Sequence, residues 1–106
     1  MEHWTRLTNA DDRLLARDEV HHSARAVGPD KRHFHLLIVN ISARGLMARC
    51  ETCWQPGDKL TVTLPVLGVT KCEIRWSLGG RIGCELDETI ALSDYFELLS
   101  HLMRRR

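Results

Sequence analysis

The stretch KCEIRWSLGGRIGCEL, residues 71–86, holds two alternating segments on either side of a pair of glycines. Apolar and charged residues take turns in both segments, which is the pattern of a β-strand with one buried face. Gly79 and Gly80 suit the tight turn between two such strands. We therefore predict a hairpin whose inward-facing residues are Cys72, Ile74 and Trp76 in the first strand and Ile82, Cys84 and Leu86 in the second.

The two-residue period extends upstream from this hairpin to about residue 20, with turn signals GPDK and QPGD at residues 28–31 and 55–58. Several short strands with turns at near-regular spacing are typical of a small antiparallel barrel. We predict an all-β fold, a six-stranded antiparallel β-barrel over residues 20–90. Its first four strands are expected at Val20–Val27, at Arg32–Ile41, and around residues 46–51 and 60–64.

The hydrophobic period changes after Ala91, where Leu92, Phe96, Leu99 and Met103 follow one another at the spacing of an amphipathic helix. These four residues predict the buried stripe of a C-terminal helix within residues 91–106. Ser93 is expected to cap its N-terminus, and the closing arginines 104–106 suit the negative end of the helix dipole. The helix is expected to pack on the barrel or plug it.

Length and composition describe one folded domain without a linker. The chain has 106 residues, of which 43% are hydrophobic and 27% are charged, and its formal net charge is +1. A charge this close to zero argues against DNA or RNA as a partner, because these polyanions attract basic surfaces. Since no apolar run approaches the length of a membrane span and the N-terminus lacks a signal-peptide pattern, we expect a cytoplasmic protein without membrane insertion.

The cysteines and histidines raise the alternative of a metal site. Cys50 and Cys53 have the C-x2-C spacing of a zinc knuckle, but no second pair of ligands follows at the required spacing. Because Cys72 and Cys84 lie on predicted inward faces, buried reduced thiols are favoured over zinc ligands. No nucleophile or isolated pair of carboxylates suggests catalysis, so we expect neither an enzyme, nor a metal, nor a cofactor.

Two short motifs remain. RLLAR, from Arg13 to Arg17, places two guanidinium groups on the same side of the chain, where they form an anion site unless nearby acidic residues pair with them. NISARG, from Asn40 to Gly45, lies between the second and third predicted strands. Taken alone it describes an ordinary turn, because Asn and Ser bond their own backbone and Gly lacks a Cβ.

The ordered pair of motifs on this strand plan resembles the PilZ domain. That family carries an R-x-x-x-R segment before its first strand and a (D/N)-x-S-x-x-G turn between its second and third strands. The segments PGD at 56–58, RW at 75–76 and GGRIGCEL at 79–86 are also similar to the family's later strands. The resemblance covers nearly the whole chain.

The resemblance implies a receptor for the bacterial second messenger cyclic di-GMP, without catalysis. It implies that Arg13 and Arg17 clasp phosphates and guanine edges. Asn40, Ser42 and Gly45 would form the turn that receives the other face of the ligand, with Asn40 and Ser42 bonding guanine or the sugar-phosphate. Arg44 adds a third cation. On this interpretation residues 1–19 are a flexible segment that closes over the ligand and signals to a partner protein. The alternative is a PilZ-like adaptor that binds protein without nucleotide.

Overall fold

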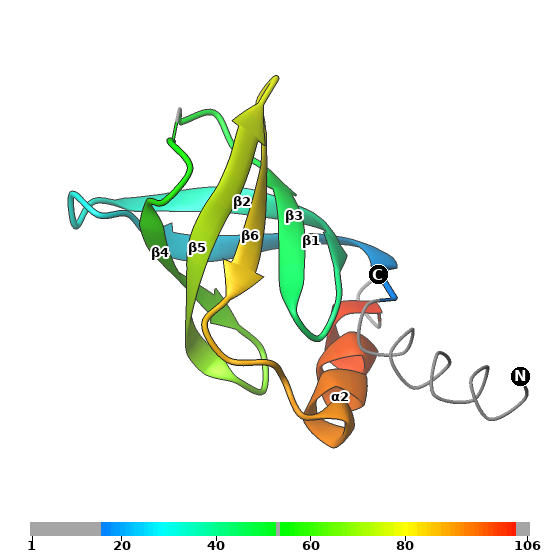
Figure 1. Ribbon diagram of the computed structural model, residues 1–106. Coiled ribbons are helices and arrows are strands. Elements are labelled where there is room, and N and C mark those ends of the chain that lie inside the picture. Colours follow the sequence, from blue (N-terminus) through cyan, green and yellow to red (C-terminus); the bar gives the residue numbers. More distant parts are fainter. Residues whose placement is uncertain (1–15, 53, 104–106) are drawn as a thin grey trace, which may run out of the picture.

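The structure is a computed structural model that describes residues 16–52 and 54–103 (Figure 1). These residues form six strands followed by one helix. The strands are β1 (Asp18–Val27), β2 (His33–Ile41), β3 (Gly45–Arg49), β4 (Lys59–Leu64), β5 (Gly68–Leu78) and β6 (Arg81–Leu86), and the helix is α2 (Leu92–Met103). β1 begins at Asp18, two residues earlier than expected. None of the described residues belongs to a helix long and apolar enough to cross a membrane.

The strands form a closed barrel in the order β1-β2-β3-β6-β5-β4. All neighbours are antiparallel, and the ring closes where Ala26 and Val27 of β1 pair with Val62 and Thr61 of β4. The prediction of a six-stranded antiparallel barrel is therefore confirmed. Closure pairs the outer strands with each other, so that the sheet has no free edge along the paired residues.

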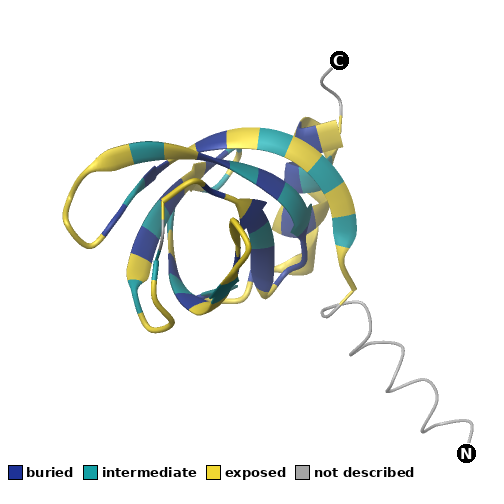
Figure 2. Cartoon of the chain, turned by 90° about the horizontal axis from the view of Figure 1, so that it is seen from above, coloured by how far each residue is buried: buried dark blue, intermediate teal, exposed yellow. Residues whose placement is uncertain are grey.

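Buried and exposed residues alternate along the strands, as Figure 2 shows from above. The alternation appears in β4, where Leu60, Val62 and Leu64 are buried, and in β6, where Ile82 and Leu86 are buried. Side chains on the inner face of a small barrel fill its interior, which accounts for the continuous apolar core. The inward face predicted for β6 is confirmed.

Trp76 does not face the core, contrary to the prediction from the alternating pattern. The pairing of β5 with β6 shifts between Ile74, which is opposite Cys84, and Trp76, which is opposite Gly83. Two residues of β5 thus correspond to one of β6, which is a β-bulge that reverses the side on which the next side chain lies. Trp76 is 40% exposed as a result, and its indole ring lies across Gly83, where a Cβ would collide with it.

The stripe predicted to be buried on the C-terminal helix is also wrong. α2 packs on one end of the barrel (Figure 1). It buries a neighbouring stripe of side chains, while most of the predicted stripe is exposed. Both stripes are apolar and have helical spacing, so periodicity alone does not choose between them. The buried residues are Tyr95, Leu98 and Leu102, the exposed ones are Leu92, Phe96 and Met103, and Leu99 is half-buried.

Ser93 is not the N-cap of this helix. The first bond of the helix joins the backbone N–H of Tyr95 to the carbonyl oxygen of Ala91, 2.8 Å away. The residue whose carbonyl accepts this first bond occupies the N-cap position, so Ala91 caps the helix and Ser93 lies in its first turn. Asp94 in the same turn complements the positive end of the helix dipole.

Candidate functional site

The turn between β2 and β3 is organised by the hydroxyl of Ser42. Its Oγ accepts hydrogen bonds from the backbone N–H groups of Arg44 and Gly45, both at 3.2 Å. The backbone N–H of Ser42 in turn donates to the carbonyl oxygen of Gly45 at 2.8 Å. Ser42 is only 4% exposed. Its side chain therefore shapes the turn from inside.

Gly45 is required at the end of this turn by a close approach of two backbones. A Cβ at this position would collide with the carbonyl oxygen of Cys84 on β6. Its φ lies outside the left-handed region, where Gly57, Gly79 and Gly80 are found. The absence of a side chain, rather than the conformational freedom of glycine, is what the site needs.

The last residue of β6 and the segment that follows it hold the turn from the opposite side. The backbone N–H of Leu86 donates to the carbonyl oxygen of Arg44, and that of Ile90 donates to the carbonyl oxygen of Ala43, both at 2.8 Å. The backbone of the turn is thus bonded on both sides, while the side chain of Arg44 remains exposed. The guanidinium group of Arg44 is therefore attached to a backbone that hydrogen bonds hold in place.

The two motifs meet at Arg17 and Asn40. The Nη1 of Arg17 donates to the Oδ1 of Asn40 at 2.9 Å, across 23 residues of sequence. The amide nitrogen of Asn40 donates to the sulfur of Met47 on β3 at 3.7 Å, so the two ends of the amide have different partners. The structure therefore brings together Arg17, Asn40 and the β2–β3 turn, whereas Arg13 lies outside the described residues.

Neither arginine of this region is neutralised by the described part of the chain. The ion pairs within 4.0 Å among described residues involve other cations, namely Arg32, Lys59 and Arg75. Arg17 and Arg44 are both exposed. Two guanidinium groups with unsatisfied N–H donors at one end of a barrel suit a phosphate or the acceptor edge of a purine base.

Tyr95 is a residue of this region that the sequence analysis missed. Its hydroxyl oxygen lies 2.6 Å from the Oδ2 of Asp18 and 2.9 Å from the carbonyl oxygen of Ile41. Asp18 follows Arg17, and Ile41 follows Asn40, so α2 contacts the neighbours of both motif residues. Tyr95, Leu98 and Leu102 are spaced at i, i+3 and i+7, which places them on one face of a helix, but this spacing does not indicate the acceptors of the hydroxyl.

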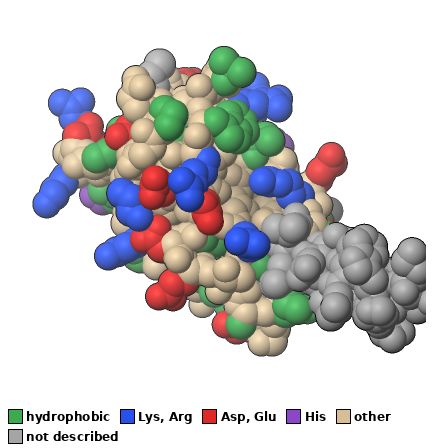
Figure 3. All heavy atoms as spheres, in the orientation of Figure 1, with side chains coloured by type: hydrophobic (Ala, Val, Ile, Leu, Met, Phe, Trp, Pro, Cys, Tyr) green, Lys and Arg blue, Asp and Glu red, His purple; other side chains and the backbone are tan. Residues whose placement is uncertain are grey.

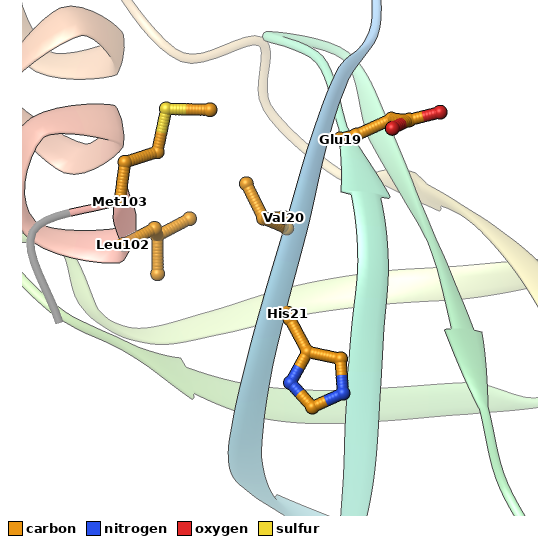
Figure 4. Close-up of a pocket in the computed structure, with 5 residues that line it drawn as sticks. All are labelled: Glu19, Val20, His21, Leu102 and Met103. Carbon is orange, nitrogen blue, oxygen red and sulfur yellow. The ribbon is translucent and has the colours of Figure 1, made fainter. Parts of the chain in front are cut away.

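A pocket of about 580 Å³ lies between β1 and the end of α2 (Figure 4). Val20 points from β1 toward the helix, while Leu102 and Met103 point from the helix toward β1. The other lining residues are Glu19 and His21. Because the lining holds a carboxylate and neither Arg17 nor Arg44, this pocket does not by itself suit an anionic ligand.

The cysteines that the structure describes do not form a metal site. Cys50, Cys72 and Cys84 are free and buried, and Cys53 lies outside the described residues. Residues 16–52 and 54–103 contain no cluster of three or more metal-binding side chains. The hydrogen bond with the Cys72 thiol, together with burial, raises the pKa of the Cys84 thiol. A thiol held in its protonated form is a poor metal ligand and nucleophile.

Charges of both signs are interspersed on the surface. Figure 3 shows Lys and Arg side chains among Asp and Glu side chains on the face that it presents. No continuous basic area forms on that face. A local arginine site therefore accounts for anion binding better than a general attraction for polyanions does.

A closed barrel with two polar segments brought together at one end is a small ligand-binding domain. Comparison with protein families finds that the PilZ domain matches residues 11–104. The chain therefore belongs to the PilZ domain family, which is a family of cyclic di-GMP receptors rather than of catalysts. A search of curated proteins found no significant match.

Proposed function

We propose that this chain is a cyclic di-GMP receptor of the bacterial cytoplasm. The observation that carries the proposal is the hydrogen bond between Arg17 and Asn40, since it joins the R-x-x-x-R segment to the N-x-S-x-x-G turn. Membership of the PilZ family supports the choice of ligand. We expect no catalysis and no cofactor beyond this ligand.

Arginine is suited to both halves of the ligand. A guanidinium has five N–H donors in a planar fork, so Arg17 can keep its bond to Asn40 and still bind a phosphate oxygen. The same fork matches the O6 and N7 acceptors of guanine. We propose that Arg13 and Arg44 supply further charge-assisted bonds to the two phosphates and the bases.

The remaining motif residues have different proposed roles. Asn40 presents an amide that can bond a base or a sugar-phosphate oxygen. Ser42 and Gly45 act through the backbone, because the hydroxyl of Ser42 is engaged within the turn and Gly45 permits the contact with β6. We propose that Ser42 and Gly45 maintain the backbone conformation of the β2–β3 turn, while the side chains of Arg17, Asn40 and Arg44 bind the ligand.

Binding is proposed to change the segment before β1 and so to signal to a partner protein. Arg17 directly precedes β1, and the R-x-x-x-R motif continues upstream from it. A dianionic ligand offers Arg13 and Arg17 charge-assisted hydrogen bonds, so the segment is expected to close over the ligand. The altered surface would then be read by a protein effector.

Calorimetric titration of the full chain with cyclic di-GMP tests the proposal. Cyclic di-AMP and GTP serve as matched ligands, because the first keeps the ring of phosphates but changes the base, and the second keeps the base but not the ring. We expect saturable binding of cyclic di-GMP and at least about tenfold weaker binding of the other two. Absence of cyclic di-GMP binding would contradict the proposal.

An adaptor function without nucleotide is the second candidate, and one observation favours it. Leu92, Phe96 and Met103 are exposed on α2, although large apolar side chains are more often buried. An apolar segment of a partner protein would cover them. If saturating cyclic di-GMP leaves the chain unaltered, this helix face becomes the surface to test, by substituting Phe96 and measuring partner binding.

A further inference from the structure

The hydroxyl of Tyr95 joins three elements at a single point. Tyr95 lies on α2 and is 2% exposed. Its hydroxyl is within hydrogen-bond distance of the Asp18 carboxylate on β1 and of the Ile41 backbone carbonyl on β2. Asp18 and Ile41 are directly paired across the two strands. The hydroxyl has one proton for two oxygen acceptors, so its position responds to the spacing of both strands.

The next pair of residues along the same two strands belongs to the candidate site. Glu19 pairs with Asn40, and Arg17 donates to Asn40 from the position before Asp18. The hydroxyl of Tyr95 therefore contacts Asp18 and Ile41, the residues that directly follow Arg17 and Asn40 in the sequence. The hydrogen bond between Arg17 and Asn40 is the one that joins the motifs. A small displacement of the end of β1 or β2 on ligand binding would therefore change the hydrogen-bond geometry of the Tyr95 hydroxyl.

We propose that Tyr95 is a positioning residue that aligns Arg17 with Asn40 and couples nucleotide binding to α2. This inference rests on the proposed function and deepens it, because it names the element through which occupancy of the site is transmitted. α2 carries the exposed residues Leu92, Phe96 and Met103, so a shift of this helix would change the apolar surface offered to a partner.

Hydrogen-bond geometry distinguishes this role from simple packing. The ring of Tyr95 packs within the core, and phenylalanine would retain that packing. Only the hydroxyl reaches Asp18 and Ile41, so Tyr95→Phe removes the link and keeps the ring. By reciprocity, if α2 favours the aligned arrangement of the site, a ligand that stabilises the site must stabilise the attachment of α2 by the same factor.

The first test uses the ligand-free protein. Amide hydrogen exchange is compared between the wild type and Tyr95→Phe, and we expect faster exchange at residues 40–45 in the variant, with β4 and β5 unchanged. Identical exchange at residues 40–45 in the two proteins would overturn the positioning role. This measurement needs no nucleotide, so it decides the role of Tyr95 even if the receptor proposal fails.

The second test measures affinity for cyclic di-GMP. Tyr95→Phe and Asp18→Ala are each expected to bind about threefold to tenfold more weakly, and the double variant no more weakly than Tyr95→Phe, because that change already removes the bond between the hydroxyl and Asp18. Asp18→Asn is the matched control, since its side-chain oxygen still accepts the hydroxyl proton and should retain most of the affinity. Fully additive losses in the double variant would overturn the shared link.

The third test measures how ligand binding changes the amide hydrogen exchange of α2. In the wild type, saturating cyclic di-GMP is expected to slow exchange in α2, and Tyr95→Phe is expected to abolish that change while still binding. A wild type that binds nucleotide without any change in α2 contradicts the coupling alone. A wild type that does not bind contradicts the receptor function. If Tyr95→Phe does not fold, the same measurements are made on Asp18→Ala, which lacks the acceptor of the hydroxyl, and on Asp18→Asn, which keeps one.

Discussion

At the scale of single residues, Ser42 and Gly45 show how a turn motif differs from the ordinary turn that it resembles. The hydroxyl of Ser42 is buried and bonded to the backbone of the turn, and Gly45 lies against the carbonyl oxygen of Cys84. A hairpin turn exposed to water needs neither feature. These contacts tie the turn to β6, so that the exposed Arg44 stands on a fixed backbone.

Gly45→Ala is expected to destabilise the fold by about 1 to 3 kcal/mol, because its Cβ would press on the backbone of β6, which cannot move as a flexible side chain can. Gly79→Ala is the matched control, since no atom lies within 4 Å of its Cβ and only its positive φ opposes alanine. Chemical denaturation gives the two free energies of unfolding. An equal or smaller loss for Gly45→Ala would show that β3 and β6 do not approach as described.

Arg17→Ala is expected to leave the melting temperature almost unchanged and to weaken cyclic di-GMP binding by about 1.5 to 3 kcal/mol, through loss of charge-assisted hydrogen bonds. Arg17 is exposed, so it adds little to the core. Arg25→Ala, an exposed arginine farther along β1, is the control and should bind as the wild type does. Calorimetry that finds unchanged affinity for Arg17→Ala would exclude this residue from the site.

At the scale of elements, α2 has two overlapping apolar stripes, and the barrel takes only one of them. Leu98 is buried in the core, whereas Phe96 is 44% exposed. The buried stripe is the one that contains Tyr95, whose hydroxyl finds acceptors on β1 and β2. Burial of this stripe is thus compatible with the polar hydroxyl of Tyr95, because the hydroxyl finds acceptors there. A buried hydroxyl without acceptors would cost free energy.

Substitutions on the two stripes should therefore have unequal effects. Leu98→Ala is expected to lower the free energy of unfolding by about 2 to 5 kcal/mol by leaving a cavity in the core. Phe96→Ser on the exposed stripe should cost less than about 1 kcal/mol. Thermal and chemical denaturation of both variants measures the difference, and the reverse order would mean that the helix packs through the other face.

At the scale of the whole molecule, the barrel is a closed frame with its ligand segments at one end. The candidate site lies at the ends of the paired strands, because Arg17 precedes β1 and the turn joins β2 to β3. Ligand binding is therefore expected to act on the ends of the strands and to leave the frame unchanged.

Amide exchange should show this division directly. Saturating cyclic di-GMP is expected to slow exchange together at residues 11–19 and 40–45, because both segments contact the same ligand, while β4 and β5 change little. Mass spectrometry of peptides from both segments provides the measurement. Protection confined to one segment would mean that the two motifs do not share a ligand.

The thiols of the core provide a check on the whole frame. In a Cys53→Ser variant, the remaining thiols are expected to react with a disulfide reagent only as fast as the protein unfolds, since all three are buried. The hydrogen bond with the Cys72 thiol and burial raise the pKa of the Cys84 thiol, which keeps this thiol protonated and unreactive at neutral pH. Fast reaction at pH 7 would contradict a closed core.

The sequence by itself determined the elements whose evidence is local. The two-residue period of β4 and β6 was sufficient because a strand with one face in a barrel must alternate, whatever its neighbours are. The resemblance of the two motifs to a known family led us to expect that Arg17 and Asn40 contact the same ligand, but it did not predict a hydrogen bond between them. The distance between them was supplied only by the structure.

Only the tertiary structure decided the features that depend on pairing between elements. The bulge that turns Trp76 outward arises from the register of β5 against β6, which no property of β5 alone specifies. The face of α2 that is buried depends on acceptors in β1 and β2, so Tyr95 could not be recognised from helical period alone. Local patterns determine which face of a strand is apolar, but the partner strand or helix determines where a polar group or an extra residue is accommodated.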